Sequence, residues 1–484
     1  MTSVAIVGQA WRTPLGRSVT EAVSRLLTDE RAAIASPRAA GYACSVVAPI
    51  VDEPAKSRQS RFLRRMGLFG LEVAHEAFAI AKAAAIPLPV LADGNRVGLF
   101  AGVGGLRAHW DDMLKALEHQ AEDGANGWER GLREVHPYWM LRHLSNNVHA
   151  LAAMDLGLRG EGATYGGATG GAQALAAAAR ALNDGAIDAA LVVAYDSLLE
   201  PETLVELGAR RAATLGTDPS LIATAYDERA AGFVPGEAAG AVVLVRSADA
   251  PVDAVRIAVA DGADGEREEP ATSTLARTLR GVLVSLTGAP PSSSREAASS
   301  REASSSREAS SREVSSSREA SSSREASSSR EVSSWREVSS SGEAPCVDHS
   351  PLAFVDGAAR AWPDRDAAEL AMLAELLAAP TPLTAITAAF GQLGAATTMI
   401  QAIALGELLR RGHPAPVIRH VGPSAGPSSP IAGQSSPSAG PSSPSAGPSS
   451  PSAGHSIAVG LSTGAPGLCA AIRVELIGGA PRDD

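Results

Sequence analysis

Apolar residues recur along the chain with two different periods. Residues 61–85 place apolar side chains at helical spacing, whereas residues 96–103 form a short apolar run that ends in a glycine-rich segment and predicts a buried strand. The second half repeats this alternation. Its predicted strands lie at 254–260, 352–356, 383–387 and 456–460, and its predicted helices lie near 272–287, 366–379 and 395–411. Strands alternating with helices predict an α/β fold in which largely parallel sheets are covered by helices on both faces.

The most informative segment follows a predicted helix at 136–157. It reads GEGATYGGATGG at 160–171, continues as an alanine-rich helix and ends in the apolar run 187–195. This order predicts a strand, a sharp glycine-rich turn, a helix and a second buried strand, with Thr169 at the turn. Such an elbow exposes one side chain above a helix N-terminus, where the helix dipole and free amide groups stabilise a developing negative charge. Thr169 is therefore the first candidate functional residue.

Two low-complexity segments lengthen the chain of 484 residues. Residues 289–345 repeat Ser, Arg and Glu, and residues 422–455 repeat Gly, Pro and Ser. Neither carries enough apolar surface to offset the entropy of ordering the chain, so we expect both to be disordered surface insertions that act as solvated spacers. Roughly 390 residues remain to build the folded core.

Charge and cysteine content exclude several classes of protein. The formal net charge of −11 argues against nucleic acid as a partner, because phosphate binding requires clustered Lys and Arg on one face. The three cysteines, Cys44, Cys346 and Cys469, lie far apart in sequence, which fits a reducing compartment without a disulfide framework. There is no signal-type start, and no apolar run approaches membrane length. These features predict a cytoplasmic protein without a membrane segment.

The elbow resembles that of the beta-ketoacyl synthases, the condensing enzymes of fatty-acid and polyketide synthesis. In that family a cysteine occupies the elbow within a TACSS-type sequence, and gapless alignment puts that cysteine at Thr169. Two further stretches match in order and spacing. VAIVGQAWRTPLG at 4–16 resembles the family's opening strand and turn, and YDERAAGFVPGEAAG at 226–240 resembles its FDxxRDGFVxGEGAG sequence.

The resemblance implies a thiolase-like fold. Such a fold contains two related βαβαβαββ halves in a layered α-β-α-β-α arrangement, which we expect at residues 1–250 and 251–484. The roughly 390 residues outside the two insertions match the size of one synthase. Membership of this acyltransferase family leaves open whether the chain is itself an enzyme.

The resemblance also implies where two catalytic histidines should stand. One lies in a DAHGTGT-type loop, which matches FVDGAARAWPDRDAAE at 354–369 and places the histidine position at Ala358. The other lies in a GHxxGAA turn, which matches ITAAFGQLGAA at 386–396; aligning FG puts it at Gln392, and aligning LGAA puts it at Gly391. Neither position holds an imidazole. Because a threonine hydroxyl is a weak nucleophile without an adjacent base, Cys-dependent condensation is not expected.

The oxyanion site of the family is implied at Thr169 and Gly170 of the elbow and at Gly464. The family's C-terminal GFGGxN segment matches LSTGAPGLCA at 461–470, where Gly464 is kept and Gly467 stands at the asparagine position. The second part of the oxyanion site is therefore altered as well.

A synthase scaffold without its triad resembles the chain-length factors, partner subunits that shape the tunnel of an active ketosynthase. The stretches 60–71 and 136–147 resemble that branch, although its elbow commonly carries glutamine. We therefore expect a heterodimer with an active ketosynthase that acts on acyl carrier protein. The apolar helix 170–183 and strand 187–195 suggest a large buried interface beside the elbow. Two alternatives stay open: an acyltransferase or decarboxylase that uses Thr169 or the elbow alone, and a standalone acyl-binding scaffold.

Other chemistry-bearing residues have simpler interpretations. Cys346 and His349 lack the further ligands of a metal site, and the GVGG sequence at 102–105 lacks the lysine of a phosphate loop, so we expect no metal and no cofactor. Glu237 is expected to join a hydrogen-bond network around the elbow. Three histidines of the predicted helix are expected to be polar core or interface groups rather than catalysts: His136, His143 and His149.

Overall fold

The computed structural model describes residues 3–36, 39, 41, 42, 44–83, 89–104, 110–263, 278–283, 352–377, 379–422, 456–463 and 468–477. All of them belong to one compact unit. The Ser-Arg-Glu repeat at 289–345 and all but the first residue of the Gly-Pro-Ser repeat at 422–455 lie outside the described residues, so the expectation of disorder for both stays a prediction.

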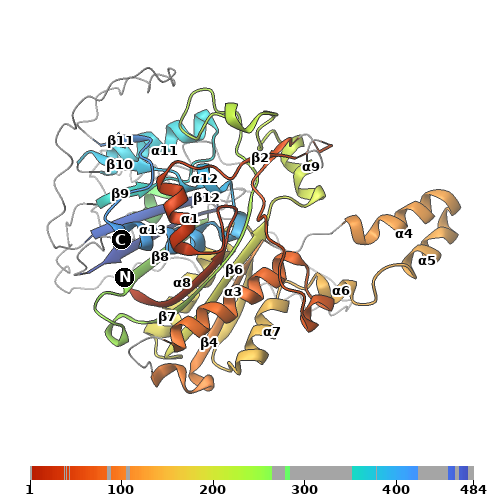
Figure 1. Ribbon diagram of the computed structural model, residues 1–484, viewed down its shortest axis with the longest axis horizontal. Helices are drawn as coiled ribbons and strands as arrows, with labels where there is room; N and C mark the ends of the chain where they lie inside the picture. The colour runs from red at the N-terminus through yellow and green to blue at the C-terminus, as the bar shows by residue number, and fades with distance from the viewer. Residues whose placement is uncertain are drawn as a thin grey trace, which may run out of the picture. The chain divides into compact units, whose positions relative to one another are not determined.

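One mixed sheet organises the described part of the chain, in which eleven strands run in the order β11-β10-β9-β12-β13-β8-β1-β7-β6-β4-β5 (Figure 1). The first half contributes β1 (Val4–Arg12), β4 (Val97–Val103), β5 (Gly162–Gly166), β6 (Ala189–Ser197) and β7 (Glu237–Arg246). The second half contributes β8 (Val255–Ala263), β9 (Leu352–Asp356), β10 (Thr381–Thr384), β11 (Arg419–Val421), β12 (Ser456–Thr463) and β13 (Leu468–Leu476). Two short strands, β2 (Ile34–Ala35) and β3 (Val46–Val47), pair separately.

The two halves repeat one strand topology. In the first, β1 runs antiparallel to β7, β7 antiparallel to β6, and β6 and β5 both parallel to β4. In the second, β8, β13, β12, β9 and β10 follow the same pattern in the same chain order. The prediction of two related halves is confirmed, whereas the expectation of largely parallel sheets is wrong. Each half closes with antiparallel strands, because its last strand inserts between the first and the fourth. The boundary at residue 250 stays a prediction.

Helices occupy three layers around the sheet. In the middle, α8 (Gly170–Asn183) and α13 (Thr397–Arg411) contact strands from both halves. The outer face of the first half is covered by α3 (Arg65–Lys82) and α7 (Asn147–Leu156), and that of the second by α11 (Pro363–Leu376) and the helical residues 278–283. The layered α-β-α-β-α arrangement is therefore confirmed.

Strand β6 shows how the sequence specifies these layers. Its alternate side chains point to opposite faces, so Val192 packs in the central core with α8, while Leu191 and Val193 pack with α3. Helix α8 is almost entirely buried and consists mainly of alanine, which lets it lie close to both halves of the sheet. The apolar surface of α8 is covered by α13 and by the second half of the same chain, so it is not itself evidence of a subunit interface. The interface predicted beside the elbow stays a prediction.

Some predicted elements differ from the structure for local reasons. The helix expected at 136–157 is divided into α6 (Trp139–Arg142) and α7. The strand expected at 383–387 ends at Thr384, and α12 (Ile386–Phe390) follows, because the buried carboxylate of Asp356 accepts a hydrogen bond from the backbone N–H of Ile386. Helix α11 begins earlier than predicted, at Pro363, a residue favoured in the first helical turn.

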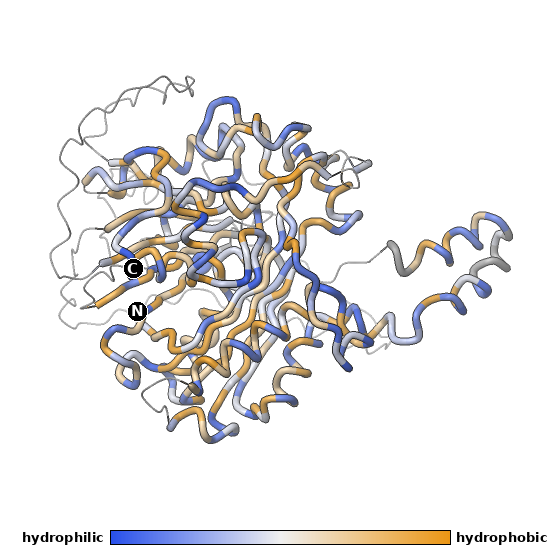
Figure 2. Tube along the Cα trace, in the orientation of Figure 1, coloured by the Kyte–Doolittle hydropathy of each residue, from blue (hydrophilic) through white to orange (hydrophobic). Residues whose placement is uncertain are grey.

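An unpredicted helical hairpin, α4 (Trp110–Asp123) and α5 (Ala125–Leu132), extends away from the sheet (Figure 1). The two helices pack on each other, and apolar positions alternate with hydrophilic ones along them (Figure 2). The remaining described α-helices are α1 (Val19–Leu27) and α9 (Pro201–Ala209). Of the helices in the described ranges, none is both long and apolar enough to span a lipid bilayer.

Candidate active site and its hydrogen-bond network

Thr169 lies at the elbow that the sequence predicts, between the end of β5 and the start of α8. It is the N-cap residue of α8, with φ of −107° and ψ of 14°, but its side chain does not cap the helix. Only 4% of Thr169 is exposed. Glycine is required just beyond it, because a Cβ atom on Gly171 would overlap the carbonyl oxygen of Ala395. The elbow therefore rests directly on the 3-10 turn η7 (Gly394–Ala396).

The two predicted histidine positions meet in the structure. The side-chain Nε2 of Gln392 donates hydrogen bonds to the carbonyl oxygens of Ala358, at 3.2 Å, and Ala359, at 2.9 Å. Gln392 is buried, and its backbone bonds to Val234 and Gly236 of the first half. Because η7 begins two residues after Gln392 and contacts α8, the fold brings the elbow and both predicted histidine positions into one region.

The loop that carries Ala358 is held in an uncommon backbone conformation. Ala359 and Ala361 have φ of 47° and 53°, in the left-handed region that glycine adopts more easily. The DAHGTGT-type sequence that this loop resembles has glycine at both places. The neighbouring Tyr226 is also left-handed, with φ of 65°, and its hydroxyl accepts a hydrogen bond from the backbone N–H of Ala359 at 3.2 Å.

Buried carboxyl groups hold this loop and the end of the strand that precedes it, and Asp366 accepts a hydrogen bond from the backbone N–H of Arg360 in the loop at 3.2 Å. Glu369 accepts a hydrogen bond from the backbone N–H of Ala358 at 2.8 Å, and burial raises the pKa of Glu369 to about 7. Asp356 accepts hydrogen bonds from Thr384, Ile386 and Gln401, and burial raises its pKa to about 6. In the sequence, Glu369 serves only to align the loop with the family motif, and no role is predicted for it. The available signal was its position after the loop in the DxxE pattern.

Glu237 joins a hydrogen-bond network that leads to the elbow. Its carboxylate accepts hydrogen bonds from Arg65 at 2.6 Å, from the backbone N–H of Ile50 at 2.9 Å and from the hydroxyl of Ser197 at 3.1 Å. The backbone N–H of Ser197 in turn donates to Asp196. Asp196 also accepts a hydrogen bond from the N–H of Ala395 in η7 at 2.9 Å. This network fixes the ends of β6 and β7 against the turn on which the elbow rests.

A small cavity of about 110 Å³ lies beside this network, at the carboxyl ends of β4 and β6. Its walls mix the apolar side chains of Leu63 and Met66 with the charged groups of Arg142, Asp196 and Glu200. Thr169 does not line it. The charged lining distinguishes this cavity from an apolar pocket for an alkyl chain.

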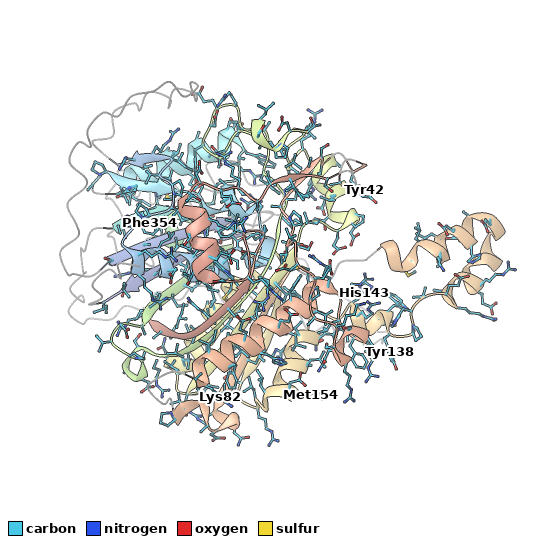
Figure 3. All side chains as sticks on the ribbon, in the orientation of Figure 1. Tyr42, Lys82, Tyr138, His143, Met154 and Phe354 are labelled. Carbon is cyan, nitrogen blue, oxygen red and sulfur yellow. The ribbon has the colours of Figure 1, made fainter. Side chains whose placement is uncertain are left out.

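His136, His143 and His149, which the sequence analysis expects to be core or interface groups, lie in three different environments. His149 lies against β5, where its Nδ1 atom is 3.2 Å from the hydroxyl of Thr164, and burial lowers the pKa of His149. His143 packs edge-on against Trp139, and His136 lies beside Tyr138. His143 and Tyr138 are labelled in Figure 3. The structure gives each an aromatic or polar neighbour and places none of them in the contacts described for Gln392.

Of the other candidate residues named in the sequence analysis, Gly102 has a structural role and four lie outside the described residues. Gly102 is needed for close packing, because a Cβ atom there would overlap the backbone of Gly171. Cys346, His349, Gly464 and Gly467 lie outside the described residues, so their predicted roles stay predictions. Within the described ranges, no three His, Cys, Asp or Glu residues are grouped so that they could hold a metal ion.

Known proteins share this architecture. A family model, the beta-ketoacyl synthase N-terminal domain, matches residues 1–250. No curated protein matches the chain. A beta-ketoacyl synthase structure from Burkholderia phymatum is 16% identical, with a TM-score of 0.67 over 99% of this chain and 100% of that one. The ishigamide ketosynthase/chain length factor is 15% identical, with a TM-score of 0.65 over 99% and 100% of the two chains.

A third structure, AntDE:AntF, is a type II polyketide synthase acyl-carrier protein in complex with its ketosynthase. It is 16% identical, with a TM-score of 0.64, and the match covers 98% of this chain and 99% of that one. At these identities the structures show a shared fold. The family match covers more than half of the sequence and includes the elbow, and the chain therefore belongs to the beta-ketoacyl synthase family.

Proposed function

We propose that this chain is a catalytically silent subunit of the chain-length-factor kind, which pairs with an active ketosynthase that elongates acyl chains on a carrier protein. The observation that carries the proposal is the contact between Gln392 and Ala358. An amide group fills the place that the family resemblance assigns to imidazole, and an amide neither takes up nor releases a proton near neutral pH. Condensation in this family uses a cysteine and two imidazole groups, and Thr169, Ala358 and Gln392 supply none of them.

The free edge of the sheet supports pairing with another chain. Strand β5 ends the sheet, and within the described residues it pairs only with β4. Its residues are exposed or half-buried. An uncovered edge strand leaves a row of backbone N–H and C=O groups that bind another strand, and proteins usually cover such an edge. Because β5 leads directly into the elbow, a partner on this edge would lie close to Thr169.

Four exposed apolar residues lie in and around α6, the short helix that precedes α7 in the chain. Tyr138, Met140, Leu141 and Leu144 are 40%, 68%, 43% and 48% exposed, and we call them the α6 patch. Figure 3 labels Tyr138 of this patch and Met154. Met154 of α7 is 77% exposed, and the same helix contacts β5 through His149 and Thr164. Apolar side chains gathered in this way are typical of protein interfaces, and the α6 patch is continuous in sequence with the α4–α5 hairpin.

The named relatives fit this form of assembly. One solved structure with this fold is a ketosynthase/chain length factor, and another is a ketosynthase in complex with its acyl-carrier protein. A homodimer of this chain would bring together two sites without imidazole. We therefore propose a heterodimer in which the active subunit supplies the chemistry and this chain shapes the space for the growing product.

The enzyme alternative has less support in the geometry. An acyltransferase that used Thr169 would need its hydroxyl to reach a thioester and a base to accept its proton. Thr169 is 4% exposed, and the contacts around η7 are made by backbone groups and by Asp196. The scaffold alternative keeps the same fold and differs from our proposal in the absence of a ketosynthase partner.

Co-expression tests the proposal. The chain is produced with a candidate ketosynthase that retains its Cys-His-His triad, and the pair is examined by size-exclusion chromatography with light scattering. We expect a complex of one copy of each chain, and we expect replacement of Ala168 by Trp to shorten the products of the pair without abolishing turnover. Failure to associate, or products unaffected by bulky residues at positions 166 and 168, would favour the scaffold alternative.

A further inference from the structure

The small cavity at the carboxyl ends of β4 and β6 is separated from the elbow by the end of a single strand. Val103 and Gly104, at the end of β4, line the cavity. The carbonyl oxygen of Val103 also accepts a hydrogen bond from the N–H of Gly167 in the elbow turn at 2.9 Å, and a Cβ atom on Gly170 would lie 3.0 Å from the same oxygen. The end of β4 is therefore a wall between this cavity and the turn that holds Thr169.

Asp196 completes this wall from the end of β6. It lines the cavity and is only 5% exposed. A Cβ atom on either Gly104 or Gly394 would overlap its carboxyl group, so the group fills a space that exists only because both residues are glycine. Since Gly104 follows β4 and Gly394 begins η7, the side chain of Asp196 lies between these two segments.

Backbone hydrogen bonds hold the carboxyl group of Asp196 in place. It accepts one from the N–H of Ser197 at 2.8 Å and another from the N–H of Ala395 at 2.9 Å. Ala395 in turn lies against the elbow helix, because a Cβ atom on Gly171 would overlap its carbonyl oxygen. Asp196 is thus connected through one residue to the helix that begins at Thr169.

We infer that Asp196 closes the elbow from inside the molecule, so that position 169 cannot be reached from the cavity whichever side chain stands there. The low exposure of Thr169, 4%, agrees with this closure. Removal of the carboxyl group would join the cavity of about 110 Å³ to the space between β4 and η7. The shape of the chain, and not only the identity of residue 169, then prevents acylation at the elbow. Asp196 acts through the packing around the elbow and is a positioning residue.

The labelling rate of an introduced cysteine tests the inference. Thr169→Cys is made in the full chain, iodoacetamide is added, and mass spectrometry of the peptide that contains residue 169 measures the rate. We expect labelling about a hundredfold or more slower than in the same chain unfolded in urea, because a buried thiol reacts only when the structure opens locally. Adding Asp196→Ala should accelerate labelling of the folded chain about tenfold or more, the factor expected when a group held by two buried hydrogen bonds is lost.

Two further variants separate closure from a general loss of stability. Asp188→Ala is the matched control, because Asp188 directly precedes β6 and its carboxylate pairs with Arg96 and Arg246 at the opposite end of that strand. It should not accelerate labelling at residue 169. Asp196→Asn keeps the volume of the side chain but offers one acceptor oxygen in place of two, so it should accelerate labelling less than Asp196→Ala does.

Thermal unfolding of each variant verifies that it is folded. The inference is overturned if Thr169→Cys alone labels as fast in the folded chain as in urea, a comparison that needs no change at Asp196. It is also overturned if Asp196→Ala leaves the rate unchanged, or if Asp188→Ala or Asp196→Asn accelerates labelling as much as Asp196→Ala. None of these measurements involves a ketosynthase, so their outcome is independent of the proposed pairing.

Discussion

Gln392 donates a hydrogen bond from Nε2 to the carbonyl oxygen of Ala358, with 3.2 Å between the two atoms. The contact joins the loop after β9 to the turn before α13, the two places where the family resemblance puts histidine. We therefore expect the amide to stabilise the loop rather than to act on a substrate. A side chain committed to backbone carbonyls in the interior is not free to polarise a thioester.

The first prediction follows from this contact. The purified chain should not condense acyl and malonyl thioesters, because acid–base assistance worth roughly a hundred- to ten-thousand-fold is missing. Thr169→Cys should not restore condensation, because it supplies a thiol but no imidazole, and the burial of this position should limit acylation of either side chain by an acyl-carrier thioester. Mass spectrometry of the intact protein measures the adduct. A stable acyl adduct on wild-type Thr169 would contradict the silent-subunit proposal.

The second prediction concerns pH and Glu369. Folding raises the pKa of this carboxyl from 4.5 to about 7, so folding takes up a proton between these values. The stabilising contribution is complete below about pH 4.5 and is lost as the pH rises through 7. Glu369→Gln should remove a pH dependence on the order of 2–3 kcal/mol in the free energy of unfolding between pH 5 and 8.

Urea unfolding at several pH values measures this effect. Glu228→Gln is the control, because Glu228 is exposed and should leave the pH dependence as it is in the wild type. The assignment to Glu369 fails if the Glu369→Gln variant keeps the full pH dependence.

The third prediction concerns the left-handed alanines. Ala359→Gly and Ala361→Gly should each be neutral or stabilising by up to about 1 kcal/mol, because glycine adopts a positive φ without the steric cost that alanine bears. Ala358→Gly is the matched control in the same loop. Ala358 is not among the residues with positive φ, so this change should instead destabilise the protein by about 0.5–1 kcal/mol. Melting temperatures of the three variants compare the two effects, and similar losses in all three would contradict the argument.

The fourth prediction concerns the α6 patch. Met140→Glu should prevent association with a ketosynthase while changing the stability of the isolated chain by less than about 0.5 kcal/mol, because the side chain is already 68% exposed. Val252→Glu alters a residue with similar exposure, 73%, that lies in the loop before β8 and should not affect pairing. Light scattering of the co-expressed pair gives the result. Loss of pairing in both variants would indicate a general effect of added charge.

The apolar pattern of the sequence predicts those helices and strands that keep the same face buried along their whole length. Strand β4 and helices α3 and α13 lie close to their expected positions, because their apolar periods match the layers that bury them. The elbow was located for the same reason. The helix α12 was missed, because its first N–H bonds to Asp356, which lies 30 residues away in sequence. No local pattern contains a contact of that range.

In the candidate site too, contacts between residues distant in sequence could not be predicted from local patterns. The meeting of Gln392 with Ala358 followed from a family resemblance and not from periodicity. The contact of Tyr226 with Ala359 spans 133 residues and involves a tyrosine whose sequence context matches only the family motif. The α4–α5 hairpin and the free edge of β5 could not be predicted, because both depend on which strands end the sheet.

The pairing of β1 with β8 has a consequence for dissecting the protein. Val4, Ala5 and Ile6 pair with residues 255–257, so the sheet runs without interruption from one half into the other. A fragment ending at residue 250 would expose this edge of β1 together with the face of α8 that α13 covers. We expect such an excised half to aggregate rather than fold. We therefore expect that residues 1–250, although they match one family domain, cannot be purified as a folded protein on their own.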